Sequence, residues 1–364
     1  MVTSAYQFVL ALHRDDGSPL GEAPMLPDFE PAMNCAEFEG VRRGQLPAVL
    51  GAAGGTVEPI WDEQLREPFI GGFRVTAVAG GGETAAGDFP VSYFAGLAQR
   101  ASSQCVKAGT LKPGDKFYYV VMAFRREAGP EIPPAAEEPP GAIVAEEIGQ
   151  PLRLIRSPMG AFAKGSSPSG QGRPEDFRVF IPKRILDETA QLVHDAGAME
   201  VGGVLIGHLH RDITASTDVF LEITAQIPGR HVRSELTRLV FTAETWAAAR
   251  GAVELRGRRE IWAGWWHAHS YLKQLQGKDG DGGRTRDSSA AAFMSTEDIA
   301  LHRTLFARAY SVALVVSSTR EDMTWSLFGW RDGMVASRSF DMLQASPSET
   351  PLTADAPAAE KVGT

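Results

Sequence analysis

Cysteine is almost absent from this sequence of 364 residues, in which Cys35 and Cys105 are the only two. Two cysteines cannot build a disulfide framework, nor can they supply a structural zinc site made of four thiolates. We expect both to be reduced and partly buried. The composition therefore excludes the small domains that depend on disulfide bonds for their stability.

Long hydrophobic runs are also missing. No stretch approaches the ~18 consecutive apolar residues that a membrane-spanning helix needs. Residues 1–18 contain one short apolar run without a basic region before it, which is not the pattern of a signal peptide. The sequence therefore predicts no membrane partner and a cytoplasmic location.

An excess of positive charge is lacking as well. Lysine and arginine number 36 against 45 aspartate and glutamate residues, so the net charge is -9. Because phosphate backbones are bound by clustered basic surfaces, we expect no nucleic-acid partner. The hydrophobic fraction of 43% and the charged fraction of 22% are those of an ordinary globular protein.

Shifts in composition divide the chain into four parts. We predict an α+β amino-terminal domain over residues 1–128 and a linker with one anchored apolar segment over 129–176. A second domain follows over 177–343, and a disordered Pro/Ala/Thr/Ser-rich tail over 344–364. The length is sufficient for two domains with buried cores.

The amino-terminal domain combines two hydrophobic periods. Residues 6–12, 73–79 and 116–124 are β-branched or aromatic and predict strands, whereas residues 90–107 repeat apolar side chains at helical spacing. No catalytic constellation is visible in this domain. We therefore expect it to bind a partner or a protein substrate.

In the second domain, predicted strands alternate with a few capped helices. A helix after the strand at 177–181 should end at Gly197, another should begin at Thr242, and a third should begin at Ser295. Strands interleaved with helices indicate an α/β or α+β fold.

Two histidines, His267 and His269, lie two residues apart in a predicted strand. Side chains at such positions point to the same side, so both imidazoles could bind one metal ion. The pair alone is weak support, because two surface histidines at a strand end fit it equally well. A catalytic zinc site needs a third protein ligand and leaves one position for water.

Asp298 offers that third ligand in the first turn of the helix that Ser295 begins. The Ser-x-x-Asp step is equally a helix-capping motif, whether or not a metal is bound. Glu200 precedes a strongly apolar strand and could act as the general base of a zinc hydrolase; otherwise it is a surface carboxylate.

In order along the chain, these elements resemble the signature of the JAMM (MPN/JAB) zinc metalloproteases, and of their prokaryotic JAB branch in particular. The resemblance covers residues 178–335, and the positions that carry it are Glu200, Gly202, Gly203, Leu205, Gly207, Gly264, Trp265, His267, His269, Ser295 and Asp298. It implies a β-sheet sandwiched by helices, as in cytidine deaminases. It also implies one Zn²⁺ per chain, bound by His267, His269 and Asp298.

By the same resemblance, Glu200 is the acid/base and Ser295 helps to stabilise the tetrahedral intermediate. Members of the family are deubiquitinase-like isopeptidases, which cleave the bond after the carboxy-terminal glycine of ubiquitin or a ubiquitin-like protein. The implied partners are such a modifier, its conjugates, and the cognate activating and conjugating enzymes. Some bacterial members serve in antiviral defence.

Residues 270–294 depart from the family pattern, because a much shorter segment usually separates the second histidine from the serine. This Gly-rich, charged insertion is either a lid or clamp for the substrate or a tolerated surface loop. Two other functions stay open: a metal-free MPN scaffold and a zinc hydrolase of a small molecule.

Three further histidines need an interpretation. His208 and His210 form a second pair two residues apart, which we expect to be a surface pair and not a metal site. His302 lies four residues beyond Asp298 on one helix face. We expect it to be an ordinary surface histidine, with a supporting role behind the metal ligands as the alternative.

Overall fold

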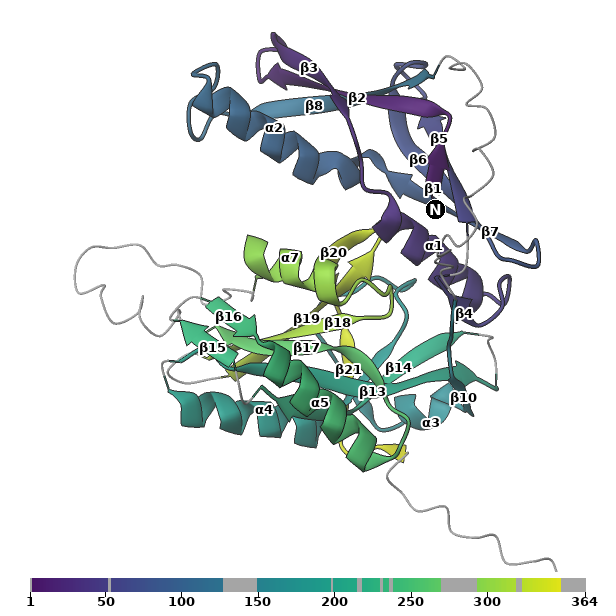
Figure 1. Ribbon diagram of the computed structural model, residues 1–364, viewed down its shortest axis with the longest axis vertical. Helices are drawn as coiled ribbons and strands as arrows, with labels where there is room; N and C mark the ends of the chain where they lie inside the picture. The colour runs from purple at the N-terminus through teal and green to yellow at the C-terminus, as the bar shows by residue number, and fades with distance from the viewer. Residues whose placement is uncertain are drawn as a thin grey trace, which may run out of the picture.

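The computed structural model describes residues 2–51, 54–126, 149–197, 199–214, 218–229, 232–235, 238–269, 293–318 and 323–347. Within them the protein is a mixed α/β structure with several sheets, the largest of which is strongly curled (Figure 1). In this part of the chain, no helix is long and apolar enough to cross a membrane.

The amino-terminal half contains two small sheets. One has the strand order β1 (Val2–Ser4), β5 (Gly54–Trp61), β6 (Ile70–Val78) and β7 (Thr84–Pro90). The other has the order β3 (Pro19–Met25), β2 (Tyr6–Arg14) and β8 (Phe117–Arg125). Strands β2, β6 and β8 confirm the three strands predicted from the sequence.

Helix α2 (Ala95–Lys107), with the short 3₁₀ turn η1 (Val91–Phe94) before it, confirms the predicted helix of this half. Helix α1 (Glu30–Arg42) was not predicted, and most of its residues are buried. In Figure 1, α1 lies between the amino-terminal sheets and the carboxy-terminal half. On one side, Gly40 allows a close approach to Ala85 of β7.

The carboxy-terminal half is built on the large sheet, whose main path has nine strands. Their order is β11 (Ser166–Ser169), β21 (Phe340–Leu343), β12 (Val179–Pro182), β14 (Val219–Pro228), β13 (Gly202–Asp212), β17 (Ile261–His269), β18 (Val312–Ser318), β19 (Met323–Arg331) and β20 (Met334–Arg338). A further strand, β10 (Leu154–Ser157), pairs with β13. Parallel and antiparallel pairs alternate irregularly, so the sheet is mixed.

Short elements complete the chain. β15 (Val232–Glu235) and β16 (Arg238–Phe241) form a hairpin, and β4 (Val49–Leu50) pairs with β9 (Gln150–Pro151). Residues 150–169, which fall within the predicted linker, form β9, β10, α3 (Met159–Ala163) and β11.

Helices cover both faces of the large sheet. α4 (Lys183–Ala196) ends at Gly197 as predicted, and its buried residues share a cluster with Leu205 of β13. α5 (Ala243–Arg256) begins at Thr242 as predicted, and its Ala249 packs with Val204 and Ile206. Because successive strand residues face opposite sides, α4 and α5 lie on opposite faces of the sheet.

The two halves share one continuous core cluster. Phe38 of α1 contacts Phe177 edge-on, with ring centroids 5.4 Å apart, and lies 5.9 Å from the ring of Tyr310. At the end of α1, the buried Arg42 guanidinium donates to both carboxylate oxygens of Asp218. Helix α1 therefore belongs to the cores of both halves.

Candidate functional site

The candidate site is formed by strand β17 and by helix α7 (Thr296–Leu305), which packs beside it. β17 is an inner strand that pairs with β13 on one side and β18 on the other. His267 lies opposite Gly202 of β13 and Val315 of β18, and it is 1% exposed. The predicted strand is confirmed, and the alternative of a surface histidine is wrong for His267.

Ser295 and Asp298 form a reciprocal capping box at the start of α7. The Ser295 hydroxyl oxygen accepts from the Asp298 backbone N–H at 3.1 Å, and Asp298 Oδ2 accepts from the Ser295 N–H at 2.8 Å. This satisfies two N–H groups that a helix start would otherwise leave without a partner. The predicted N-cap is confirmed, and the cap fixes the direction of the Asp298 carboxylate.

That carboxylate points at the histidine of β17. Asp298 Oδ2 lies 3.4 Å from His267 Nε2. Two ligand atoms that each bind zinc at about 2.0–2.1 Å in tetrahedral geometry are about 3.3–3.4 Å apart. The nitrogen and oxygen donors also suit zinc, so this pair fits two positions of a zinc site.

His269 is the third predicted ligand. Its backbone belongs to β17 and pairs with Ser317 of β18, but its side chain lies outside the described part of the structure. Among the described side chains, no group of three or more histidine, cysteine, aspartate or glutamate residues is placed to hold a metal ion. The structure therefore places two of the three predicted ligands together.

Glu200 lies two residues before the start of β13, near the histidine end of β17. The carbonyl of Val201 accepts from the Ala268 N–H at 2.8 Å, which extends the β13–β17 register beyond Gly202. The Glu200 side chain is only 6% exposed, so the surface alternative for this carboxylate is wrong. Glu200 is therefore a buried carboxylate close in sequence to the strand that pairs with His267.

An aromatic stack supports His267 from behind. Its ring lies parallel to the indole of Trp265, with centroids 4.6 Å apart and an interplanar angle of 12°. The Trp265 Nε1–H donates to Nδ1 of His302 on α7 at 3.1 Å. His302 is fully buried, and this burial lowers its pKa to about 3. The surface position expected for His302 is wrong, and no hydrophobic period in the sequence indicated its burial.

In the second histidine pair, His210 is buried and His208 is partly exposed. His210 is 1% exposed; its Nε2 lies 3.1 Å from Glu222 Oε2 and its Nδ1 lies 2.9 Å from the Ser157 hydroxyl. Burial lowers the pKa of the half-buried His208. The expectation of a surface position is wrong for His210, because β10 pairs with this part of β13 and covers it. The His210 contacts hold the segment around Ser157 on the sheet.

Of the insertion at residues 270–294, residues 270–292 lie outside the described part of the structure. Both interpretations of it, as a lid or as a surface loop, stay predictions. Phe293, the first described residue after it, is 58% exposed.

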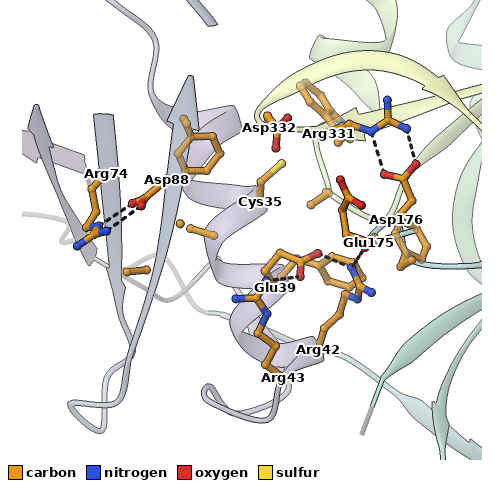
Figure 2. A pocket seen from close by; sticks show the side chains of 18 of the residues that line it. Cys35, Glu39, Arg42, Arg43, Arg74, Asp88, Glu175, Asp176, Arg331 and Asp332 are labelled. Carbon is orange, nitrogen blue, oxygen red and sulfur yellow. Dashed lines mark hydrogen bonds and ion pairs between the residues drawn. The ribbon is translucent and has the colours of Figure 1, made fainter. Parts of the chain in front are cut away.

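A cavity of about 370 Å³ lies elsewhere, between α1 and the carboxy-terminal half, and Figure 2 shows it from close by. None of the residues of the predicted site line it. Its arginines pair with acidic neighbours: Arg331 with Asp176, and Arg74 with Asp88. Burial raises the pKa of the Cys35 thiol in its wall to about 12, which excludes a reactive thiolate at neutral pH. We interpret this cavity as part of the junction between the halves.

No family model and no curated protein matches this sequence. Among solved structures, one similar chain is the solution structure of protein DSY2949 from Desulfitobacterium hafniense, a structural-genomics target. It is 14% identical, has a TM-score of 0.33, and the match covers 47% of the present chain and 97% of the other.

Proposed function

We propose that this protein is a zinc-dependent isopeptidase or protease of the JAMM type, with His267, His269 and Asp298 as metal ligands. The observation that supports this most directly is the 3.4 Å separation of His267 Nε2 and Asp298 Oδ2, brought together from a central strand and a capped helix. In this proposal, the large sheet between α4 and α5 is a JAB/MPN-type sheet of the cytidine-deaminase-like class.

Each side chain then has a distinct task. Zinc held by His267, His269 and Asp298 would supply Lewis-acid chemistry, polarising the scissile carbonyl and lowering the pKa of water toward ~7. The Glu200 carboxylate removes a proton from the attacking water and delivers it to the leaving nitrogen. The Ser295 hydroxyl oxygen accepts a hydrogen bond from the Asp298 N–H. Because a hydroxyl group also has one proton to donate, Ser295 can donate a hydrogen bond to the developing oxyanion.

The substrate that we propose is the bond after the carboxy-terminal glycine of a ubiquitin-like protein, in a conjugate or in a precursor, in the cytoplasm. This assignment rests on the resemblance in residues 178–335. The amino-terminal half has no predicted chemistry of its own, so we assign it to binding of the modifier or of a partner, including the cognate activating and conjugating enzymes.

The decisive experiment measures zinc per chain and hydrolysis of a ubiquitin-like fusion in four proteins: the native chain, His267→Ala, Asp298→Ala and Glu200→Gln. We expect about one zinc in the native chain and in Glu200→Gln, because a general base is not a ligand. The two ligand variants should lose zinc and activity, whereas Glu200→Gln should lose at least about a hundredfold in kcat.

Other results have clear meanings. A folded native chain without zinc after metal supplementation would leave the metal-free scaffold as the better account. Zinc binding combined with hydrolysis of small amides, but not of a ubiquitin-like fusion, would favour the small-molecule hydrolase. Near-normal turnover in Glu200→Gln would contradict our assignment of the base.

A further inference from the structure

Helix α7 carries Ser295 and Asp298 at its start, yet only one of its residues, His302, is fully buried. His302 lies one turn beyond Asp298, so both side chains are on the same face of the helix. A polar ring without exposure is costly unless it is hydrogen-bonded. The hydrogen-bond partner of His302 therefore indicates why this ring is buried.

That partner is Trp265 of β17, whose indole N–H lies 3.1 Å from His302 Nδ1. An indole nitrogen can only donate, so Nδ1 accepts and carries no proton. His302 is therefore a neutral ring with its proton on Nε2. The strong lowering of its pKa by burial agrees with a neutral ring.

The contact completes a closed set of four side chains from two elements. On β17, Trp265 stacks on His267 at 4.6 Å. On α7, His302 lies one turn from Asp298, and Asp298 returns to His267 at 3.4 Å. Any sliding of α7 along β17 would change the Trp265–His302 distance and the His267–Asp298 distance together.

We propose that His302 is a positioning residue for the candidate metal centre: by accepting the hydrogen bond of Trp265, it fixes α7 where Asp298 and His267 share one metal ion. It binds neither metal nor substrate. The inference rests on the proposed function, since it assumes that these residues are ligands.

Other contacts hold the carboxy-terminal end of α7, where the Trp330 indole N–H donates to the Phe306 carbonyl at 2.8 Å, but the His302 bond lies closer to Asp298. The first residues of α7, Thr296 and Glu297, are exposed, and Leu301 is only half-buried against the cluster around Trp265. Partners that orient metal ligands from behind typically change metal affinity by about 10- to 100-fold when removed. We therefore expect an effect on affinity that exceeds any general loss of stability.

The chain offers a matched control. Trp325 of β19 donates its indole N–H to the Thr189 hydroxyl of α4 at 3.3 Å. Like the Trp265–His302 bond, it joins a strand tryptophan to a helix residue of the carboxy-terminal half. Helix α4, however, covers the face of the sheet opposite to α7. Thr189→Val removes the acceptor with little change in volume, and it should lower the melting temperature without altering the metal centre.

The experiment titrates Co²⁺ alone into the full-length chain and follows the d–d absorption bands, which report affinity and geometry without any substrate. We expect His302→Phe to raise the Kd for Co²⁺ at least about tenfold. His302→Asn should recover most of this loss, because its carbonyl oxygen can occupy the place of Nδ1. Thr189→Val should bind Co²⁺ as the native chain does.

Equal Co²⁺ affinity and equal spectra in His302→Phe and the native chain would overturn the inference, as would an equal loss in Thr189→Val. If His302→Phe does not fold, Trp265→Phe removes the same hydrogen bond while keeping a ring beside His267, and the same loss is expected. A native chain that binds no Co²⁺ would be a different failure, because it rejects the proposed function itself.

Discussion

At the scale of single residues, glycine sets how closely the strands beside the site approach each other. A Cβ atom at position 264 would lie 1.8 Å from the carbonyl oxygen of Val312 on β18. A Cβ atom at position 203 would lie 2.3 Å from the carbonyl oxygen of Ile227 on β14. Gly203 and Gly264 are therefore required by the packing of neighbouring backbones, next to the histidines that β17 carries.

Gly264→Ala should lower the free energy of unfolding by about 2–3 kcal/mol, because the backbone of β17 must move away from β18. Gly251→Ala is the matched control, since no atom lies within 4 Å of the added Cβ in α5. That change should stabilise the protein by about 0.5–1 kcal/mol. Urea unfolding measures both, and a similar effect of the two variants would contradict the steric argument.

Ser295 caps α7, and one substitution can separate this role from the catalytic role that we propose for its hydroxyl group. Glycine is nearly as good an N-cap as serine, so Ser295→Gly should cost only a few tenths of a kcal/mol in stability. It removes the hydroxyl donor, however, and should lower kcat about 100-fold with KM little changed. Steady-state kinetics with thermal unfolding on the same sample tests this; a kcat loss of less than threefold would leave Ser295 as a cap alone.

At the scale of elements, the helices that could be predicted were those with a short-range sequence pattern. Helix α7 was predicted because Ser295 and Asp298 are three residues apart, and a capping box is a short-range pattern. Helix α1 was missed because it is buried on several sides, so its apolar residues do not form one stripe. The His302 contact joins residues 37 positions apart, and no pattern within α7 could have indicated it.

The segment before β12 is held by a partly buried ion-pair cluster. Asp176 accepts from Arg331 Nε at 2.9 Å and lies 3.2 Å from Nε of the buried Arg338. Burial alone would raise the pKa of Asp176, but the hydrogen bond from Arg331 and the nearby positive charges hold it below the ordinary value of 3.8. The folded state therefore favours the carboxylate.

Asp176→Asn should lower the free energy of unfolding by about 3 kcal/mol near neutral pH, because it leaves Arg338 buried without its counter-charge. Since the folded pKa is depressed, this difference should be complete above pH 3.8 and shrink as the pH falls further. Asp88→Asn is the control: its pair with Arg74 has equally good geometry but is about half exposed, so we expect a loss below about 1 kcal/mol. Chemical denaturation across this pH range measures both variants, and equal losses would refute the role of burial.

At the scale of the whole molecule, side-chain contacts join the two halves. Asn34 of α1 donates to the Ala307 carbonyl just after α7, and Arg303 of α7 pairs with Asp28. Together with the shared core around Phe38, these contacts predict a single cooperative unfolding transition. Scanning calorimetry tests this, and two separated transitions would show that the halves unfold independently.

The position of α1 also has a consequence for biosynthesis. A ribosome completes the amino-terminal half first, and that half can pair its strands at once. The side of α1 that carries Phe38 and Val41 cannot be covered at that stage, because Phe177 and Tyr310, which contact Phe38, are translated much later. During that interval an apolar helix face is exposed to the cell. We therefore expect this face of α1 to stay without its apolar partners until the large sheet has been synthesised.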